Sequence, residues 1–202
     1  RSGKVRTIGT SKQPAAGIVE AHWISERKGF ERFRCEQPHY SILNRGIERD
    51  VLPTAQRYGM GTVVWSPLAQ GMLTGRVRKG QPSTLTRQGQ YFEHLHDEHR
   101  IDAVEELIPI AENAGISLTH MAMAFVIAHP GVTAALLGPR TIDQLDDLLA
   151  GAEVSLTDGV LDQIDAIVPP GTGVGQLQMG YVPSALTMPH LRRRPVGERT
   201  AA

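Results

Sequence analysis

The sequence predicts an α/β fold built on a parallel sheet, and three observations lead to this class. Short β-branched segments alternate with segments whose apolar residues recur at helical spacing, which is the order of βα units. No two expected strands are joined by a hairpin turn, and no short internal repeat is found. Most of the expected strands end in polar or glycine-rich turns, as strands do at the binding edge of a (β/α)8 barrel or a doubly wound sheet.

The first βα unit is expected near the N-terminus. A short strand at residues 5–8 leads through a polar loop to Pro14, because proline is favoured in the first turn of a helix. This helix is expected to end at Gly29, since glycine is the residue most favoured after a helix C-terminus. A second and weaker strand is expected at residues 34–37.

The middle of the chain continues the alternation. Residues 47–58 have helical spacing, and Pro53 requires a kink or a late start. Residues 62–65 form the third expected strand. The polar stretch from Arg76 to His99 that follows is expected to be a mobile excursion, because a connection of this length is unusual in a compact domain.

Two more helices and a strand come next. An amphipathic helix from Ile101 should end at Gly115, and Ser117 should cap the following helix, which stops at Pro130. Residues 132–137 are apolar throughout, as expected for a strand covered on both faces.

The last expected helices, at residues 141–150 and 157–168, each open on a threonine cap. Beyond residue 168 proline and glycine become frequent and periodicity ends. The sequence therefore predicts a partial barrel over residues 1–168 and an irregular tail over 169–202. Four strands are half of a barrel, which needs about 250 residues.

Composition limits the classes of function. The 202 residues are 41% hydrophobic, enough for one core, and 21 basic and 21 acidic residues argue against a nucleic-acid partner. The single cysteine, Cys35, excludes an internal disulfide and fits a reducing cytoplasm. No apolar run of about 18 residues and no cleavable signal is found, so no membrane partner is expected. The chain opens on Arg1 rather than methionine, and we expect it to be part of something longer.

Four blocks carry a resemblance to a known family: IGTSKQPA (8–15), CEQPHYSILNR (35–45), VVWSPLAQGMLTGR (63–76) and LLGPRTIDQLDD (136–147). In order and spacing they resemble the C-terminal half of an aldo-keto reductase, most closely the bacterial reductases related to potassium-channel β subunits. The resemblance implies half of a (β/α)8 TIM barrel with outer helices, NADP(H) as cofactor, and reduction of aldehydes or ketones.

The resemblance also implies contacts to the nicotinamide. Ser11 and Gln37 match residues that hold its carboxamide, although Lys12 stands where a partner asparagine is expected. Trp65 matches an aromatic residue that stacks on the ring, and its flat apolar face suits that contact.

The remaining matches concern the phosphates and the adenine. Ser66, Leu68 and Gly71 match a loop around the pyrophosphate, for which backbone N–H groups and the cation of Arg76 are suitable partners. The turn and helix start that bind the 2′-phosphate and adenine are matched by Gly138, Arg140, Gln144 and Asp147, while Leu148 replaces a common asparagine. Arg140 offers bidentate donors to a dianionic phosphate, which favours NADP(H) over NAD(H).

No catalytic residue is predicted. In the family, hydride transfer relies on a tyrosine acid supported by a lysine, an aspartate and a histidine, all from the first half of the barrel. Tyr40, Tyr58, Tyr91 and Tyr181 lie in other contexts. Without that acid the reaction loses about 10²–10⁴-fold, so the chain alone is expected not to turn over.

Two other functions remain open. One is a non-catalytic NADP(H)-binding module that pairs with itself or with a partner, because open sheet edges invite association. The other is an unrelated phosphate-binding α/β enzyme, which would need an acid–base pair of its own at the strand ends.

Several of these residues have a plainer interpretation. Thr141 and Gln144 also fit a capping box, Ser11 could cap the first helix, and Trp65 could be ordinary core. His94, His96, Asp97 and His99 are suitable metal ligands by type, but their spacing matches no known site, so no metal is predicted. Cys35 is expected to be a small hydrophobe in the sheet, and the arginines at 192–194 are expected to be solvated.

Overall fold

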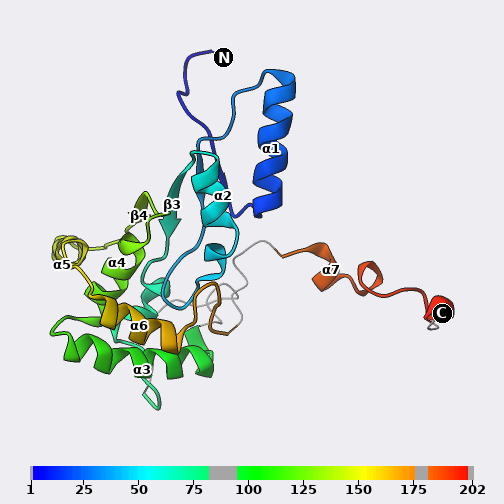
Figure 1. Cartoon of the computed structure of the whole chain (residues 1–202). Coiled ribbons are helices and arrows are strands. Elements are labelled where there is room, and N and C mark those ends of the chain that lie inside the picture. Colours follow the sequence, from blue (N-terminus) through cyan, green and yellow to red (C-terminus); the bar gives the residue numbers. More distant parts are fainter. Residues whose placement is uncertain (1, 82–94, 176–181, 200–202) are drawn as a thin grey trace.

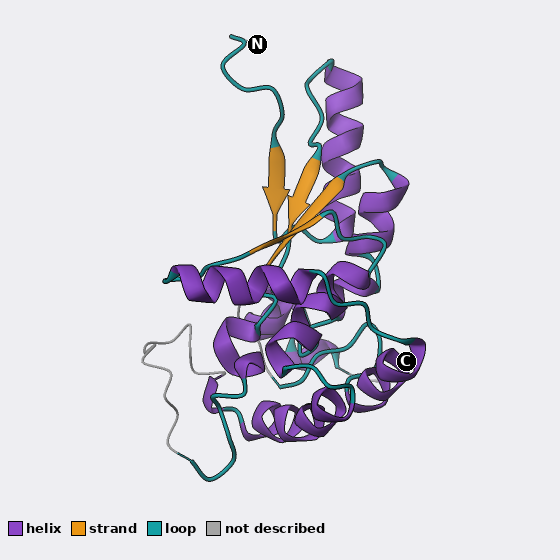
Figure 2. Ribbon diagram, turned by 90° about the vertical axis from the view of Figure 1, so that its left-hand side faces the viewer, coloured by secondary structure: helices purple, strands orange, loops and turns teal. Residues whose placement is uncertain are grey.

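Four parallel strands form one sheet in the order β1-β2-β3-β4 in the computed structural model, which describes residues 2–81, 95–175 and 182–199. The strands are β1 (Gly9–Ser11), β2 (Cys35–Gln37), β3 (Gly61–Trp65) and β4 (Ala134–Leu136). Ser11 pairs with Gln37, and Trp65 pairs with Leu136, so the carboxyl ends of the strands meet at one edge (Figure 2). The predicted parallel α/β class is confirmed, and the sheet is consistent with part of a (β/α)8 barrel.

The helices separate the strands in the chain (Figure 1). They are α1 (Ala15–Lys28), α2 (Val51–Arg57), α3 (Glu98–Asn113), α4 (Leu118–Ala128), α5 (Ile142–Ala152), α6 (Asp158–Ile167) and the short α7 (Ser184–Thr187). Single turns of 3₁₀ helix are η1 (Gly46–Glu48), η4 (Pro189–Leu191) and η5 (Val196–Glu198), and η2 (Ala69–Thr74) is a longer, kinked one. Helix α1 packs against α2, α3 against α6, and α4 against α5.

The predicted helix ends are largely confirmed. Ser117, Thr141 and Thr157 each accept a hydrogen bond from a backbone N–H in the first turn of the helix that follows. Gly29 ends α1 in the left-handed conformation, with φ 60°, which favours glycine. Pro53 gives α2 a late start at Val51, because in the first turn the missing N–H leaves no hydrogen bond unmade.

The first strand differs from the expectation. It runs over β1 rather than residues 5–8, because β1 forms only where β2 lies beside it; Val5 is 68% exposed. At the start of this pairing Gly9 lies directly against the half-buried Cys35, and a side chain at position 9 would collide with the Cys35 sulfur. The polar stretch also ends earlier than expected, since Asp97 caps α3; residues 82–94 lie outside the described part of the chain.

Two apolar clusters make up the core. The larger lies under η2, α3, α4 and α6 and includes the fully buried Leu43, Met72, Leu107 and Met121. The smaller lies between α1 and α2, and consists of Ile18, Val51, Ala55 and Met60.

A buried polar group ties the segment after β2 to the end of α6. We call Tyr40, Arg45, Glu48 and Asp165 the Arg45 cluster. Arg45 donates to Glu48 at 2.9 Å and to Asp165 at 2.6 Å, and the Tyr40 hydroxyl donates to Glu48 at 2.6 Å. Burial alone would lower the pKa of Arg45, but its hydrogen bonds to the two carboxylates outweigh burial and raise it.

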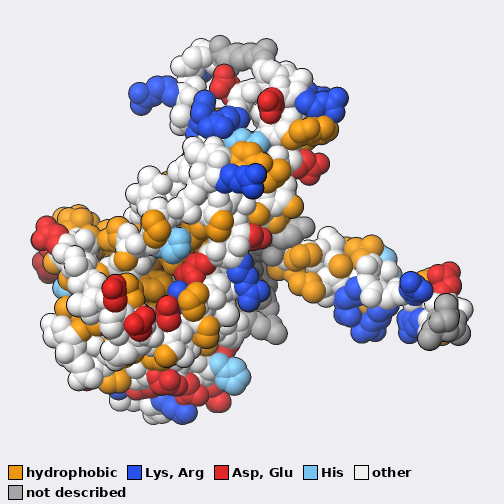
Figure 3. All heavy atoms as spheres, viewed as in Figure 1, with side chains coloured by type: hydrophobic (Ala, Val, Ile, Leu, Met, Phe, Trp, Pro, Cys, Tyr) orange, Lys and Arg blue, Asp and Glu red, His pale blue; other side chains and the backbone are white. Residues whose placement is uncertain are grey.

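Residues 169–175 pack onto this cluster. Gly171 N–H donates to Glu48, Arg45 N–H donates to the carbonyl of Thr172, and Val174 N–H donates to that of Leu43. The predicted boundary between residues 168 and 169 stays a prediction. Farther on, the described residues 182–199 extend away from the body as an arm that bears apolar and basic side chains (Figures 1 and 3).

Within the described ranges, no single helix is long and apolar enough to cross a membrane. Helices α3 and α4 together meet the test of length and composition, with a bend of 92° between them.

Candidate functional site

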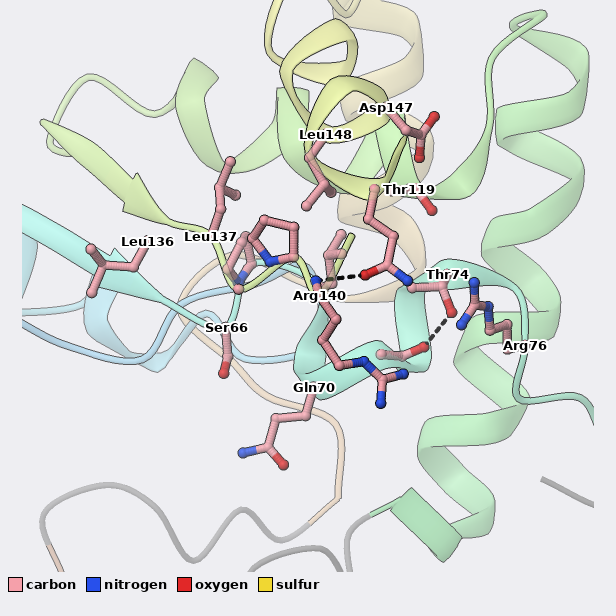
Figure 4. A pocket seen from close by; sticks show the side chains of 16 residues that line it. Ser66, Gln70, Thr74, Arg76, Thr119, Leu136, Leu137, Arg140, Asp147 and Leu148 are labelled. Atoms are coloured by element: carbon pink, nitrogen blue, oxygen red, sulfur yellow. Dashed lines mark hydrogen bonds between the residues drawn. The ribbon is translucent and has the colours of Figure 1, made fainter. Parts of the chain in front are cut away.

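A pocket of about 560 Å³ lies beyond the carboxyl ends of β3 and β4 (Figure 4). Its walls are η2, the β4–α5 turn, the start of α5 and Thr119 of α4. The structure brings together every predicted site residue from Ser66 onward: Ser66, Leu68, Gly71, Arg76, Gly138, Arg140, Gln144 and Asp147. Their roles toward a ligand stay predictions.

The η2 wall is a strained turn. Ser66, Ala69 and Gln70 have φ of 58°, 47° and 59°, a conformation that ordinary residues rarely adopt. Gly71 has φ 108°, which favours glycine. Backbone strain of this kind gathers at ligand-binding turns, so it directs attention to this wall.

Hydrogen bonds inside η2 restrict what its backbone can offer to a ligand. The Gly71 N–H donates to the Leu68 carbonyl at 2.9 Å, and the Gly71 carbonyl accepts from the Thr74 hydroxyl at 2.6 Å. The sequence suggests a Gly71 N–H that is available to an anion, but in this structure it is used within the turn. The capacity of the pocket to bind anions therefore depends mainly on its cationic side chains.

Two such side chains, Arg76 and Arg140, are exposed at the pocket. Neither belongs to an ion pair among the residues that the structure describes. Figure 4 shows them reaching from opposite walls, Arg76 after η2 and Arg140 before α5. Guanidinium groups bind phosphates through paired N–H donors, so this arrangement suits a ligand with two phosphate groups.

Gln144 fits the capping interpretation, and it lines the pocket as well. Its N–H donates to the Thr141 hydroxyl at 3.3 Å, and its side-chain oxygen accepts from the Arg140 N–H at 2.8 Å. This is close to a capping box, displaced by one residue. The cap fixes the backbone of Arg140 relative to α5.

Asp147 is the only acidic side chain among the described residues that line the pocket. Its Oδ1 lies 2.8 Å from Nε2 of His120 on α4. Sequence reasoning missed His120, because its place one turn into α4 suggested only a helix surface.

The other predicted residues, Ser11, Gln37 and Trp65, lie at the ends of neighbouring strands but do not line this pocket. Ser11 donates to the Gln37 carbonyl at 2.9 Å. The alternative that Ser11 caps α1 is wrong, because Pro14 occupies that position and no side chain caps this helix. Lys12 has φ 57°, a conformation in which asparagine is the more usual residue.

Trp65 is half-buried rather than enclosed in the core. Its ring and the His39 ring are nearly perpendicular, with 4.6 Å between their centroids. His39 is buried and lies beside Asn44. The sequence carried no signal that His39 packs against Trp65, since a histidine two residues beyond a strand is common.

Glu36 is a second residue that sequence reasoning missed. It is fully buried, accepts from the Gln13 N–H at 3.1 Å, and is also hydrogen-bonded by the Thr10 hydroxyl. These contacts hold the end of β1, which carries Ser11, and the turn that follows it. A carboxylate in the middle of a three-residue strand was the available signal, because such a group needs donors when buried.

The metal alternative gains no support. His94 lies outside the described residues, as do Tyr91 and Tyr181. Among the residues within them, no group of three or more histidine, cysteine, aspartate or glutamate side chains is arranged to hold a metal ion.

Four parallel strands with intervening helices and a pocket at their carboxyl edge define a partial (β/α) barrel protein. The model of the aldo/keto reductase family matches residues 1–169, and the chain belongs to this family.

Individual relatives agree with this assignment. The chain is 37% identical over 169 residues to the uncharacterized oxidoreductase YrpG of Bacillus subtilis, an alignment that covers 84% of this chain and 51% of that protein. It is 32% identical over 177 residues to a putative voltage-gated potassium channel subunit beta of Schizosaccharomyces pombe, covering 83% and 52%. It is 31% identical over 169 residues to the protein Tas of Escherichia coli, covering 83% and 49%. The chain thus spans about half the length of the curated relatives it matches.

Proposed function

We propose that this chain binds NADP(H) and forms the cofactor side of a reductase for aldehydes or ketones. The observation that carries the proposal is the pair Arg76 and Arg140, which line one pocket of about 560 Å³ and have no carboxylate partner among the described residues. This volume lies within the usual range of about 300–1,000 Å³ for ligand pockets. A phosphorylated dinucleotide carries two separate anionic groups, and each needs a cation.

We assign the pocket residues to successive parts of such a ligand. Arg76 would hold the pyrophosphate beside Ser66, Leu68 and Gly71, and Arg140 would hold the 2′-phosphate beside Gly138 and Gln144. With the phosphates between these cations, one end of the ligand faces the strand ends with Trp65, Ser11 and Gln37. The other end faces Thr119, Asp147 and Leu148, where the purine base would lie.

When bound, a reduced nicotinamide supplies a hydride to the substrate carbonyl. In the proposed arrangement Trp65 orients the ring by contact with its face, and Ser11 and Gln37 orient the carboxamide by hydrogen bonds. A reduction also needs a proton donor, and we propose that the four catalytic residues expected of the family are not supplied by this chain. We therefore propose that the chain binds the cofactor but does not turn over alone.

A titration tests both parts of this proposal. Trp23 is 55% exposed, so the variant Trp23→Phe leaves Trp65 as the single tryptophan reporter. Binding of NADPH should quench the fluorescence of Trp65 and increase the nicotinamide emission by energy transfer. When an aldehyde is then added, the NADPH concentration should not fall. Loss of the transfer in Arg76→Met together with Arg140→Met would place the ligand in this pocket. Absence of any NADPH binding would contradict the proposal, and rapid aldehyde reduction would contradict its second part.

A second candidate function is a non-catalytic NADP(H)-binding module that pairs with itself or with a partner. Three observations favour it. β1 and β4 are the outer strands of the sheet. Among the described residues, no further strand pairs with the outer edge of either. Ile8, which precedes β1, is 41% exposed. One relative is named a putative channel β subunit, which is a partner-bound role.

Light scattering during size-exclusion chromatography distinguishes the two candidates. A dimer that dissociates when Ile8→Lys is introduced supports pairing beside the outer strand β1. A monomer at all concentrations, with NADPH bound, contradicts pairing with itself. For either candidate we propose the cytoplasm, a reducing compartment that suits a chain with a single cysteine.

A further inference from the structure

At the α5 end of the pocket, the side-chain oxygen of Gln144 already accepts a hydrogen bond from the Arg140 N–H, and the residue after Asp147 is the apolar Leu148. Leu148 is 6% exposed and lines the pocket with Thr119. Figure 4 shows Leu148 reaching from α5 toward the turn that carries Arg140. A base placed there would rest mainly on apolar surface.

The one carboxylate at this end, among the described residues of the pocket, is held by a different helix. Asp147 Oδ1 lies 2.8 Å from His120 Nε2, and Figure 4 shows the Asp147 side chain directed away from Arg140. The exocyclic amino group of adenine is a hydrogen-bond donor, so recognising it requires an acceptor fixed toward the base. The Asp147 carboxylate instead contacts α4.

The packing of α4 on α5 places His120 beside Asp147. A Cβ at Gly151 of α5 would lie 3.1 Å from Cδ2 and 3.2 Å from Cα of His120. The imidazole of His120 therefore occupies space that only glycine leaves open at this crossing. The ring is thus packed against α5 and holds the Asp147 carboxylate through their contact, while the Asp147 side chain stays 57% exposed.

Taking the proposed NADP(H) site as a premise, we infer that this pocket does not read the amino group of the base. The pocket selects pyridine dinucleotide phosphates through their phosphate groups. It binds those that carry adenine and those that carry hypoxanthine equally well. Leu148 determines this lack of discrimination, and His120 is a positioning residue that keeps Asp147 away from the base.

The direct test compares the dissociation constants of NADPH and of its reduced hypoxanthine analogue, followed by nicotinamide fluorescence. The two constants should agree within about twofold, because no hydrogen bond is lost with the amino group; a site that depended on this bond would discriminate by about tenfold or more. A tenfold preference for NADPH overturns the inference and leaves the proposed function standing. If neither compound binds, the proposed function fails, and the inference fails with it.

Variants test the two residues separately. Leu148→Asn adds an amide acceptor and should create a preference for NADPH of roughly tenfold. The matched control is Leu149→Asn, since Leu149 lies next on the same helix, is 51% exposed and does not line the pocket. This control should keep the ratio of the two constants near one. Equal ratios in both variants contradict the role of Leu148.

His120 is tested without changing the apolar wall, in case Leu148→Asn does not fold. His120→Ala frees the Asp147 carboxylate to turn toward the base and should raise the preference for NADPH. His120→Gln retains an N–H donor and should restore the ratio of the parent chain. A ratio that stays near one in His120→Ala contradicts the positioning role, as does an equal rise in His120→Gln.

Discussion

Arg45 and Asp165 lie 120 residues apart in the sequence, and their side chains meet in an ion pair of 2.6 Å. The same guanidinium donates to Glu48 at 2.9 Å and to the carbonyl of Val168 at 2.7 Å. The side chains of Arg45 and Glu48 are 6% and 9% exposed. Because both charges are almost fully buried, each depends on the other for compensation.

Removal of Glu48 should therefore destabilise the fold strongly. Glu48→Ala leaves the Arg45 charge buried beside fewer acceptors, and we expect the free energy of unfolding to fall by about 3 kcal/mol. Urea denaturation followed by circular dichroism measures it. The control is Glu105→Ala, which breaks a pair with Arg78 that is more exposed than the Arg45–Glu48 pair, and it should lower the free energy of unfolding clearly less. Similar losses in the two variants would contradict the importance of burial.

The stability should also depend on pH through Glu48. Burial by itself would raise the pKa of this carboxyl, but hydrogen bonds from Arg45, Tyr40 and the Gly171 N–H outweigh burial and hold it below the ordinary value. A carboxyl with a lowered pKa in the folded state contributes stability above its unfolded pKa of about 4.3, and loses it as the pH falls through the folded value.

The difference in unfolding free energy between the parent chain and Glu48→Gln should thus be constant above about pH 5 and shrink below about pH 4. Denaturation curves at a series of pH values measure this difference. Growth of the difference in acid would contradict the lowered pKa.

Glycine-to-alanine changes in two helices should have opposite signs. In a helix, alanine is favoured over glycine by up to about 1 kcal/mol. A methyl group added at Gly159 of α6 would have nothing within 4 Å, so Gly159→Ala should raise the melting temperature. Gly151→Ala meets the backbone of His120 at 3.2 Å and should lower it. A rise in both variants would mean that α4 and α5 separate easily.

Arg140 should discriminate between the two nicotinamide cofactors. Charge-assisted hydrogen bonds contribute about 1.5–3 kcal/mol, so Arg140→Met should weaken NADPH binding by about tenfold or more and leave NADH binding nearly unchanged. Fluorescence titration measures both constants, with Arg192→Met on the arm as the control. Equal weakening of the two cofactors would show that Arg140 does not contact the 2′-phosphate.

The threonine caps offer a matched pair for the pocket. Thr141→Ala and Thr157→Ala each remove a cap and should destabilise the chain by about 1 kcal/mol. Only Thr141→Ala should also weaken NADPH binding, because its helix start carries Arg140 and Gln144. Parallel unfolding and binding measurements decide this, and equal binding losses would contradict the link between cap and pocket.

The sequence predicted local structure well where one residue type dominates the local energy. Threonine and serine caps, Gly29 and Pro53 acted as expected, because their effects depend on the nearest turn of backbone. The first strand was misplaced since β-branched residues at 5–8 have strand propensity but lack a partner strand there. A strand forms only where a partner strand lies beside it, and the strand propensity of a segment does not show whether a partner is present.

The candidate site was predictable in part for a similar reason. Residues from Ser66 to Asp147 meet in one pocket because parallel strands place their following turns at the same edge. The internal hydrogen bond of Gly71 and the contact of His120 with Asp147 depend on exact side-chain and loop geometry. The Arg45 cluster depends on residues far apart in the chain, and no local pattern marks such a contact.

The hydrogen bond from Val174 N–H to the carbonyl of Leu43 has a consequence for synthesis on the ribosome. Leu43 is fully buried, yet part of its cover arrives about 130 residues later in the sequence. At about 5–20 residues per second, the segment after β2 waits on the order of ten seconds for this partner. During that interval the apolar side chains of this segment are accessible to chaperones. The nascent chain should therefore depend on chaperones more than the completed chain does.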